Sequence, residues 1–310
     1  MDSIHLRAFA KINLGLRILG RRPDGYHEIR TVYQTIALHD SLEVILRRSP
    51  DRVRIECDDR TASGAPGGLA VPSGPRNLVH RACVLWKSAR KFRGGIEVHL
   101  TKRIPAGSGL GGGSSDAAAA VLGLEGLTGD RLDAARRIKL AARLGSDVPL
   151  FLWGGRVLGC GRGEEVYPLE DLPSCPCLVV VPDFTVSTAE AYQAIDASLR
   201  RSLRLTRRLG TRSMDFLGAR SPFPLEYWGP AENDFERVVF ARRPELAGLK
   251  RRLIRAGADT ASLTGSGSAL FALFASTRQL AEASRLGPES CQTFRTRTLP
   301  RREYWKAVVM

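Results

Sequence analysis

A glycine-rich segment in the middle of the chain could hold phosphate groups. It runs Pro105-Ala-Gly-Ser-Gly-Leu-Gly-Gly-Gly-Ser-Ser-Asp116, contains five glycines, and is followed at once by four alanines at 117–120. Glycine tolerates backbone dihedral angles that other residues avoid, so several amides of such a loop can point at one anion. A helix predicted to begin near Ser114 would add its free N-terminal amides and the positive end of its dipole. The segment therefore predicts a phosphate-binding loop.

Three other interpretations of this segment are weaker. A flexible linker needs neither two serines at a helix start nor so many glycines in so few residues. A Walker A loop requires a lysine directly after its last glycine, and the sequence has no lysine between Lys102 and Lys139. The dinucleotide fingerprint Gly-x-Gly-x-x-Gly is matched by Gly107, Gly109 and Gly112. The preceding strand alternates apolar and polar residues, however, whereas a Rossmann strand is buried on both faces, so a nucleoside triphosphate is favoured over NAD.

Two ionisable residues could transfer a phosphoryl group to an alcohol. This reaction needs an oriented hydroxyl, stabilisation of the developing charge and, often, a carboxylate that receives the proton. Asp147 lies in a short Gly-Ser-Asp turn between a predicted helix and a predicted strand, and Lys11 lies on the polar face of the first strand. Each also has a simpler interpretation, because such an aspartate commonly bonds its own backbone and an isolated lysine is commonly solvated.

A second turn of small residues occurs in the last quarter of the chain. The segment Ser262-Leu-Thr-Gly-Ser-Gly-Ser268 precedes a run of apolar residues from Ala269 to Phe274. It is either a plain turn before a buried strand or a second turn beside the phosphates, in which Thr264 and Ser266 supply hydroxyl donors. The sequence leaves both interpretations open.

The elements that must position these residues form a mixed pattern. Apolar residues occupy the even positions 6–18, which predicts a half-buried strand with Lys11 and Asn13 on its other face. A turn at 20–25 then predicts a hairpin with a second strand. Further strands are predicted at 42–46, 53–57, 96–100, 151–158, 177–181 and 270–274, and helices after Asn77, from about 114, and at 131–144, 188–199 and 244–256. Helices and strands do not alternate strictly, so we expect an α+β fold rather than a doubly wound parallel sheet.

Several prolines after residue 165 predict a division of the chain at about that position. We therefore expect an N-terminal domain over residues 1–165 and a C-terminal domain over residues 166–310. A segment dense in glycine and proline at 58–76 is predicted to be a long loop. Arginines at 200, 204, 207 and 208 would share one helical face, for which a solvated surface, a membrane-surface helix and a phosphate-facing lid are open interpretations.

Composition narrows the classes of protein to consider. The net charge of +15, from 47 Lys and Arg against 32 Asp and Glu, favours anionic ligands such as nucleotides or nucleic acid. The six cysteines form no Cys-x-x-Cys pair and have no histidine at zinc-finger spacing, which favours reduced thiols. Charged residues interrupt the first 20 positions, so neither a signal peptide nor a membrane span is predicted, and we expect a cytoplasmic protein.

Five separately placed motifs resemble the GHMP kinase family. In chain order they are Ala10-Lys-Ile-Asn-Leu14, Asp24-Gly-Tyr-His-Glu28, the segment 105–116, Gly145-Ser-Asp-Val-Pro149 and Leu263-Thr-Gly-Ser-Gly267. The likeness covers about residues 6–275. It implies an ATP-binding and catalytic N-terminal domain like domain 2 of ribosomal protein S5, with a left-handed βαβ crossover, and a ferredoxin-like C-terminal domain.

The resemblance implies an ATP-dependent phosphotransferase with an alcohol as acceptor. Asp147 would take the proton of the substrate hydroxyl, Lys11 would stabilise that aspartate and the transferring group, and Asn13 would position the substrate. Magnesium is expected with ATP, because metal ions bridge phosphate oxygens in phosphoryl transfer, and Ser114 or Ser115 would touch it. The residues expected to contact ATP are Asn77, at the adenine, and Pro105, Ala106, Gly107, Ser108, Gly109, Leu110, Gly111, Gly112, Gly113, Ser114 and Ser115.

The Gly-Tyr-His-Glu motif narrows the resemblance to family members that act on a cytidine nucleotide. The implied reaction transfers the γ-phosphate of ATP to the 2-hydroxyl of 4-diphosphocytidyl-2-C-methyl-D-erythritol, a step in the non-mevalonate route to isoprenoid precursors. Tyr26 and His27 would hold the cytosine and Tyr192 would close over it, since stacking and edge hydrogen bonds recognise a pyrimidine. The remaining expected substrate contacts are Thr264, Gly265 and Ser266.

Two alternative functions remain open in the sequence. Another GHMP kinase, such as a homoserine or mevalonate kinase, would share the glycine loop but would not need the Tyr26-His27 pair. A basic nucleic-acid-binding protein would use the charge of +15, although the chain has no recognisable nucleic-acid motif and few aromatic residues among its basic runs. The segments 58–76 and 199–230 match no motif of the family. We expect a small-molecule substrate, and neither a nucleic-acid nor a membrane partner.

Overall fold

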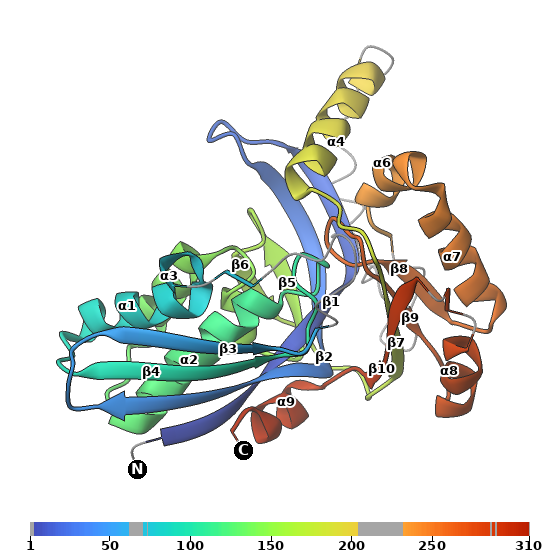
Figure 1. The fold of residues 1–310 in the computed structure, drawn as a ribbon. Helices are drawn as coiled ribbons and strands as arrows, with labels where there is room; N and C mark the ends of the chain where they lie inside the picture. The colour runs from blue at the N-terminus through green and yellow to red at the C-terminus, as the bar shows by residue number, and fades with distance from the viewer. Residues whose placement is uncertain are drawn as a thin grey trace.

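Two β-sheets organise the fold (Figure 1). The computed structural model describes residues 3–61, 71–72, 74–203, 232–285, 287–288 and 290–309. The strands of the first sheet are β1 (Ser3–Arg21), β2 (His27–Arg47), β3 (Val53–Asp59), β4 (Gly95–Lys102), β5 (Arg156–Cys160) and β6 (Glu165–Pro168). The strands of the second sheet are β7 (Pro176–Pro182), β8 (Thr260–Leu263), β9 (Leu270–Leu273) and β10 (Cys291–Arg297).

The strand order confirms the prediction of an α+β fold. The first sheet follows the order β3-β4-β2-β5-β6 with β1 paired to β2, and the second follows β10-β7-β9-β8. Strands β3 and β4 are parallel and are joined through α1 (Leu78–Arg90), which makes a βαβ unit. The left hand of its crossover stays a prediction. The other described helices are α2 (Gly112–Thr128), α3 (Ala134–Leu144), α4 (Thr188–Leu203), α6 (Phe235–Arg242), α7 (Pro244–Arg255), α8 (Thr277–Ser284) and α9 (Arg301–Val308).

The predicted hairpin of the first two strands is confirmed, but both strands differ in detail. The strand predicted separately at 42–46 is the second half of β2, because no glycine or proline interrupts residues 27–47. Strand β1 is not half-buried in its middle, where Lys11 is 3% and Asn13 is 1% exposed. The glycine loop and the turn at Gly265 cover that face, through hydrogen bonds from Lys11 N to the Leu110 carbonyl and from Gly265 N to Asn13.

Three hydrophobic cores hold the layers together. The first lies between the first sheet and helices α1 and α2, and includes the alanines 117–120. Helix α2 carries small residues because it packs close to β1: a Cβ at Gly123 would lie 2.8 Å from the Leu6 side chain. The second core lies between the second sheet and helices α6, α7 and α8, which Figure 1 shows on one side of that sheet. The third joins the two sheets through residues such as Ile12 and Phe271.

The prediction of a strand at 151–158 is wrong for the first half of that range. Pro149 begins a short 3-10 turn, η2 (Pro149–Leu152), and β5 begins only at Arg156. Gly154 and Gly155 lie between the two elements with φ angles of 63° and 67°, in the left-handed region that a strand does not contain. This irregular stretch follows Asp147 directly, so the turn that carries the carboxylate is held by a 3-10 turn rather than by a strand.

The C-terminal residues return to the first sheet. The chain passes from the first sheet to the second between β6 and β7. Helix α9 then places Tyr304 and Val308 in the core beneath the first sheet, and Val309 forms a β-bridge with Leu6. The division of the chain at about residue 165 stays a prediction.

Two sequence predictions lie outside the described residues. The basic helical face at 200–208 belongs to the end of α4 and the stretch after it, where no side chain is described. Most of the segment 58–76 also lies outside, between the end of β3 and the short 3-10 turn η1 (Gly74–Arg76). All six cysteines are free thiols. Within the described ranges, no helix has the length and apolar character needed to cross a membrane.

Candidate active site

Strand β1 and the turn after α3 bring an amine and a carboxylate together. Lys11 Nζ lies 3.5 Å from Asp147 Oδ2. Asp147 reaches this position because α3 ends at Leu144 and the backbone turns at once, with Val148 N donating to the Gly145 carbonyl. The other carboxylate oxygen, Oδ1, accepts a hydrogen bond of 3.0 Å from the hydroxyl of Tyr33. Both oxygens of Asp147 therefore contact side chains from other elements of the fold.

Burial governs the electrostatics of Lys11. It lowers the pKa of the Lys11 ammonium below its usual value of 10.5, while the charge of Asp147 and a hydrogen bond to it oppose the shift. The ammonium also donates a 2.7 Å hydrogen bond to Asn13 Oδ1 and lies 5.3 Å from the centroid of the Tyr33 ring. A charge with little water around it acts strongly on neighbouring groups. Lys11 is therefore placed to influence any anionic group that enters beside Asp147.

The side-chain amide of Asn13 connects β1 to the second small-residue turn. Its Oδ1 accepts hydrogen bonds from Gly265 N at 2.8 Å and from Lys11, and lies 3.2 Å from the Thr264 hydroxyl. Its Nδ2 donates to the hydroxyl of Thr31 at 2.7 Å. Asn13 thus fixes Lys11 relative to the turn at Thr264 and Gly265.

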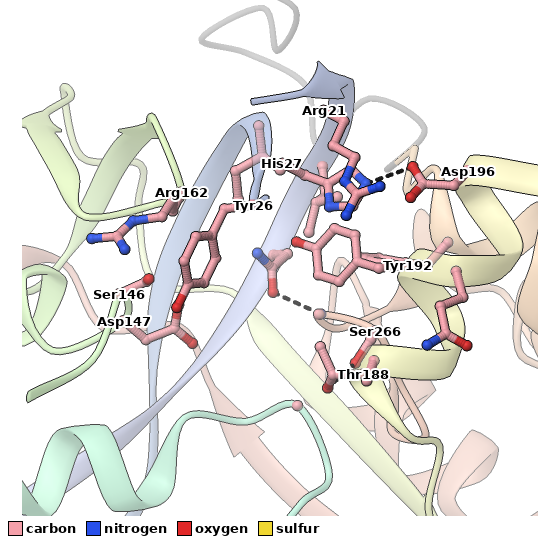
Figure 2. Close-up of a pocket in the computed structure, with 18 of the residues that line it drawn as sticks. Arg21, Tyr26, His27, Ser146, Asp147, Arg162, Thr188, Tyr192, Asp196 and Ser266 are labelled. Atoms are coloured by element: carbon pink, nitrogen blue, oxygen red, sulfur yellow. Dashed lines mark hydrogen bonds and ion pairs between the residues drawn. The ribbon is translucent and has the colours of Figure 1, made fainter. Parts of the chain in front are cut away.

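A cavity of about 560 Å³ opens over this pair of residues. Its lining residues come mostly from β1, β2 and the loops beside the first sheet, and from α4 and the turn at 265–266. Figure 2 shows Asp147 and Tyr26 on one side and Tyr192, Thr188 and Ser266 on the other. The predicted site residues that line it are Lys11, Asn13, Tyr26, His27, Gly109, Asp147, Tyr192, Gly265 and Ser266. Thr264 is not among the lining residues, because it is fully buried and its hydroxyl lies 3.0 Å from the Gly109 carbonyl.

Aromatic side chains form the outer part of this cavity. The rings of His27 and Tyr192 are stacked, with centroids 4.4 Å apart and an interplanar angle of 17°. His27 Nε2 is 2.7 Å from Asp196 Oδ1, one helical turn beyond Tyr192 on α4. Tyr26 is 56% exposed. The guanidinium carbon of Arg162 lies over the Tyr26 ring, 4.8 Å from the ring centroid. The described conformation therefore offers flat surfaces suited to stacking against a base.

The glycine loop forms a second cavity of about 320 Å³. Every loop residue from Pro105 to Ser114 lines it, together with Asn77. Gly109 and Gly111 have φ angles of 86° and 75°, and Gly111 caps the N-terminus of α2 in this left-handed conformation. A Cβ at Gly109 would lie 2.2 Å from the Thr264 carbonyl oxygen. Glycine is therefore required here both by dihedral angle and by close approach.

Ser115 and Asn77 occupy different environments at the edge of this cavity. Ser115 does not line it; its hydroxyl is buried and, within the described part of the chain, has no hydrogen-bond partner. Asn77 lines the cavity but is also the N-cap of α1, where Oδ1 accepts from Val79 N and Nδ2 donates to the Pro72 carbonyl. The predicted adenine contact of Asn77 thus coincides with a structural role, and stays a prediction.

A buried lysine holds two carboxylates next to the loop. Lys102 Nζ lies 2.7 Å from Asp116 Oδ2 and also contacts Asp40, and all three side chains are buried. Burial alone would lower the pKa of Lys102, but the charges of Asp116 and Asp40 outweigh it and raise that pKa. Asp40 also accepts a 2.8 Å hydrogen bond from Ile104 N, so this group fixes the backbone that leads into the loop.

Replacing Lys102 by methionine is expected to destabilise the protein by about 3–5 kcal/mol, because two buried carboxylates would lose their cation. Burial raises the pKa of Asp116 and the charge of Lys102 opposes that rise, so without the lysine the folded state would hold the Asp116 proton to still higher pH than the unfolded state does. The loss should therefore shrink as the pH falls, and it is measured by denaturant unfolding at pH 5 and pH 8. The control is Arg278→Met, which removes an exposed ion pair with Glu282 and should change stability little. Equal losses in both variants would contradict the structural role of Lys102.

Sequence reasoning missed several residues of these cavities, among them Asp196, Lys102, Tyr33 and Arg162. Asp196 is four residues after Tyr192 on one helix face, and this spacing could have revealed it. Lys102 stands just before the glycine loop, but its two acidic partners are distant in sequence. Tyr33 and Arg162 gave no sequence signal, because they reach the site only through the pairing of β2 with β5 and the hairpin after β5.

Comparison with known proteins identifies the family. The family model described as GHMP kinases N terminal domain matches residues 77–155, and that described as GHMP kinases C terminal matches residues 194–287. The chain is 45% identical over 301 residues to the 4-diphosphocytidyl-2-C-methyl-D-erythritol kinase of Solibacter usitatus strain Ellin6076. That alignment covers 97% of this chain and 90% of the relative.

Solved structures agree with this result. A crystal structure of a 4-(cytidine 5'-diphospho)-2C-methyl-D-erythritol kinase superposes with a TM-score of 0.70 at 32% identity, covering 95% of this chain and 99% of the other. A homoserine kinase from Cytophaga hutchinsonii superposes with a TM-score of 0.67 at 20% identity, covering 98% and 96%, and shows the shared fold alone. The chain therefore belongs to the GHMP kinase family, in the branch of the 4-diphosphocytidyl-2-C-methyl-D-erythritol kinases.

Proposed function

We propose that this chain transfers the γ-phosphate of ATP to the 2-hydroxyl of 4-diphosphocytidyl-2-C-methyl-D-erythritol, a step of the non-mevalonate route to isoprenoid precursors. ATP is the co-substrate of the family to which the chain belongs. The observation that carries the proposal is that Gly109 lines both the glycine-loop cavity and the cavity above Lys11 and Asp147. A nucleotide with its phosphates on the loop would therefore present its terminal phosphate beside the carboxylate and the amine.

Lys11 and Asp147 divide the chemistry between them in this proposal. Asp147 receives the proton of the attacking hydroxyl, and its ionised form orients that hydroxyl toward the phosphorus atom. Lys11 stabilises the charge that spreads over the transferring phosphoryl oxygens, and its burial strengthens this effect. The loop supports the arrangement, because Lys11 N donates a 2.9 Å hydrogen bond to the Leu110 carbonyl and so fixes the loop against β1.

The outer aromatic groups bind the cytidine in this proposal. Tyr26 and His27 come from the hairpin of the first domain, and Tyr192 comes from α4 of the second, so the nucleotide base would bridge the domains. Because His27 and Tyr192 are already stacked on each other, the base would stack on an exposed face of this pair or separate it. Asn13, Gly265 and Ser266 would contact the methylerythritol end of the substrate. Thr264 would support these contacts from beneath the cavity.

A magnesium ion brought by ATP fits this site. Magnesium keeps several waters and is bound mostly through phosphate oxygens, so one or two protein oxygens suffice. The hydroxyl of Ser115 is buried without a described partner, and Ser114 lines the loop cavity, so Ser114 or Ser115 would hold the ion. Within the described residues, the one cluster of His, Cys, Asp or Glu with ligand spacing is Glu56, Glu97 and His99, none of which lines either cavity. The bound ion would neutralise phosphate charge during transfer.

The remaining proposals concern organisation and location. We divide the chain into an N-terminal ATP-binding and catalytic domain at 1–165 and a C-terminal domain at 166–310, with the substrate cavity between them. We also propose a cytoplasmic location, because the free thiols suit a reducing compartment. The partner is a small molecule, and we expect neither a nucleic-acid nor a membrane partner.

His27→Ala is expected to raise the KM for the cytidyl substrate by about tenfold or more, because base stacking on an aromatic ring contributes about 1–3 kcal/mol. The KM for ATP should stay within about twofold, since His27 does not line the loop cavity. Steady-state kinetics with each substrate varied in turn checks both values. Tyr167→Ala is the control, because this exposed aromatic lies outside both cavities. An unchanged KM for the cytidyl substrate would remove His27 from the binding site.

The function is tested by ATP consumption with magnesium in the presence of three alcohols: 4-diphosphocytidyl-2-C-methyl-D-erythritol, homoserine and mevalonate. The proposal requires selective turnover of the first. Turnover of homoserine or mevalonate instead would keep the phosphate loop but overturn the assignment of Tyr26 and His27. No turnover with any alcohol, together with micromolar and steeply salt-dependent binding of RNA, would favour a nucleic-acid-binding protein.

A further inference from the structure

Tyr33 contacts both members of the reactive pair. It lies on β2, is 2% exposed, and lines the cavity above Asp147. Its hydroxyl donates a 3.0 Å hydrogen bond to Asp147 Oδ1, and Lys11 Nζ lies over its ring, 5.3 Å from the ring centroid. No motif in the sequence marks this residue, and the proposed chemistry does not yet use it.

We propose that Tyr33 is a positioning residue for phosphoryl transfer, whose hydroxyl fixes the side-chain rotamer of Asp147. This role rests on the proposed function of the same site. The two oxygens of the carboxylate have different partners: Oδ1 is taken by Tyr33, and Oδ2 lies 3.5 Å from Lys11. With Oδ1 occupied, Oδ2 is the oxygen left to face the incoming hydroxyl and the amine.

The side chain of Asp147 needs such a partner. It stands in a turn and its side chain is 32% exposed, so packing restricts its rotation less than it would in the core. A misplacement of about 1 Å in a reacting group can cost about a hundredfold in rate. Burial and the charge of Asp147 raise the pKa of Tyr33 well above 10, so its hydroxyl remains a donor at every pH at which the enzyme would work.

The surrounding backbone is shaped to hold the tyrosine ring and its hydroxyl. A Cβ at Gly159, on β5, would lie 2.5 Å from Tyr33 Cε2, and a Cβ at Gly163 would lie 2.5 Å from the Tyr33 hydroxyl oxygen. Gly163 has a φ angle of 105° in the turn between β5 and β6. This hairpin therefore leaves room for a ring with a hydroxyl and sets where that hydroxyl can lie.

A second buried tyrosine provides the matched control. Tyr304 is 3% exposed, and its hydroxyl donates a 2.7 Å hydrogen bond to the Phe151 carbonyl rather than to a carboxylate. Tyr33→Phe and Tyr304→Phe each delete one buried hydroxyl and its hydrogen bond, so their effects on stability should be similar. Only the first deletion removes a contact with the proposed base.

The experiment compares kcat and KM of these variants with the cytidyl substrate and ATP. Tyr33→Phe should lower kcat by about 10- to 100-fold, as expected for a hydrogen bond to a charged group, and leave both KM values within about twofold. Gly163→Ala, which displaces the hydroxyl without deleting it, should lower kcat in the same way. Tyr304→Phe should keep kcat within about twofold of the wild type.

A double-mutant cycle separates positioning from general damage. If Tyr33 acts through Asp147, adding Tyr33→Phe to Asp147→Asn should cause no further loss of kcat. Full activity of Tyr33→Phe, or a full additional loss in the double variant, would overturn this role while the proposed function stands. Absence of turnover by the wild-type protein would overturn the proposed function, and this role with it.

Discussion

Asp147→Asn is expected to lower kcat by about 10²- to 10⁴-fold, the range that a positioned general base contributes. Asparagine has nearly the same shape as aspartate but cannot accept a proton, and its single oxygen can keep the contact with the Tyr33 hydroxyl while its amide group faces Lys11. ATP binding should be retained, because Asp147 does not line the glycine-loop cavity. Single-turnover kinetics and nucleotide titration measure the two quantities separately.

The matched control for this substitution is Asp133→Asn. Asp133 caps the N-terminus of α3 through a hydrogen bond from Arg136 N, and asparagine is an equally good capping residue. The control should therefore keep both stability and kcat. Near-normal turnover in Asp147→Asn would show that this residue only forms the turn or positions the substrate.

Lys11→Met is expected to lower kcat by about 10²- to 10³-fold, because it removes a buried charge beside the transferring phosphoryl group. The lysine also gives the wild-type enzyme a defined pH dependence. Since burial lowers the pKa of Lys11 below 10.5, the ammonium loses its proton at a lower pH than an exposed lysine does. The kcat of the wild type should therefore fall on the alkaline side before pH 10.5.

The pH profile of kcat for the wild type and the variant measures this effect. The alkaline fall should be present in the wild type and absent from the residual activity of Lys11→Met. Lys139→Met is the control, because Lys139 is an exposed lysine on α3, outside both cavities. An alkaline fall that persists unchanged in Lys11→Met would assign it to another group and contradict the charge-stabilising role of Lys11.

Local features of the sequence predicted much of the fold and part of the site. The glycine loop was predictable because dihedral requirements and helix-start signals are local, and the structure places every residue from Pro105 to Ser114 around one cavity. The first hairpin was predictable from alternation and a turn. The pairing of Lys11 with Asp147 followed from the resemblance, since neither residue alone outweighed its simpler interpretation.

The parts that could not be predicted depend on contacts between distant segments. Asn13 bonds to Gly265, 252 residues away, and this contact, together with the glycine loop, explains why the middle of β1 is buried on both faces. The Lys102 group requires β2 and α2 to meet behind the loop. Likewise, the Tyr33 hydroxyl reaches Asp147 only once β2, β5 and the turn after α3 are assembled. Such contacts leave no periodic pattern in the sequence.

Product analysis by phosphorus NMR tests the central claim most directly. The wild-type protein would be incubated with ATP, magnesium and 4-diphosphocytidyl-2-C-methyl-D-erythritol. The account predicts ADP and a new phosphomonoester signal, with the cytidine diphosphate linkage intact. The new phosphorus should couple to carbon 2 of the methylerythritol. Free phosphate without a phosphomonoester, or an unchanged substrate spectrum, would contradict the assignment of this chain as the kinase of that hydroxyl.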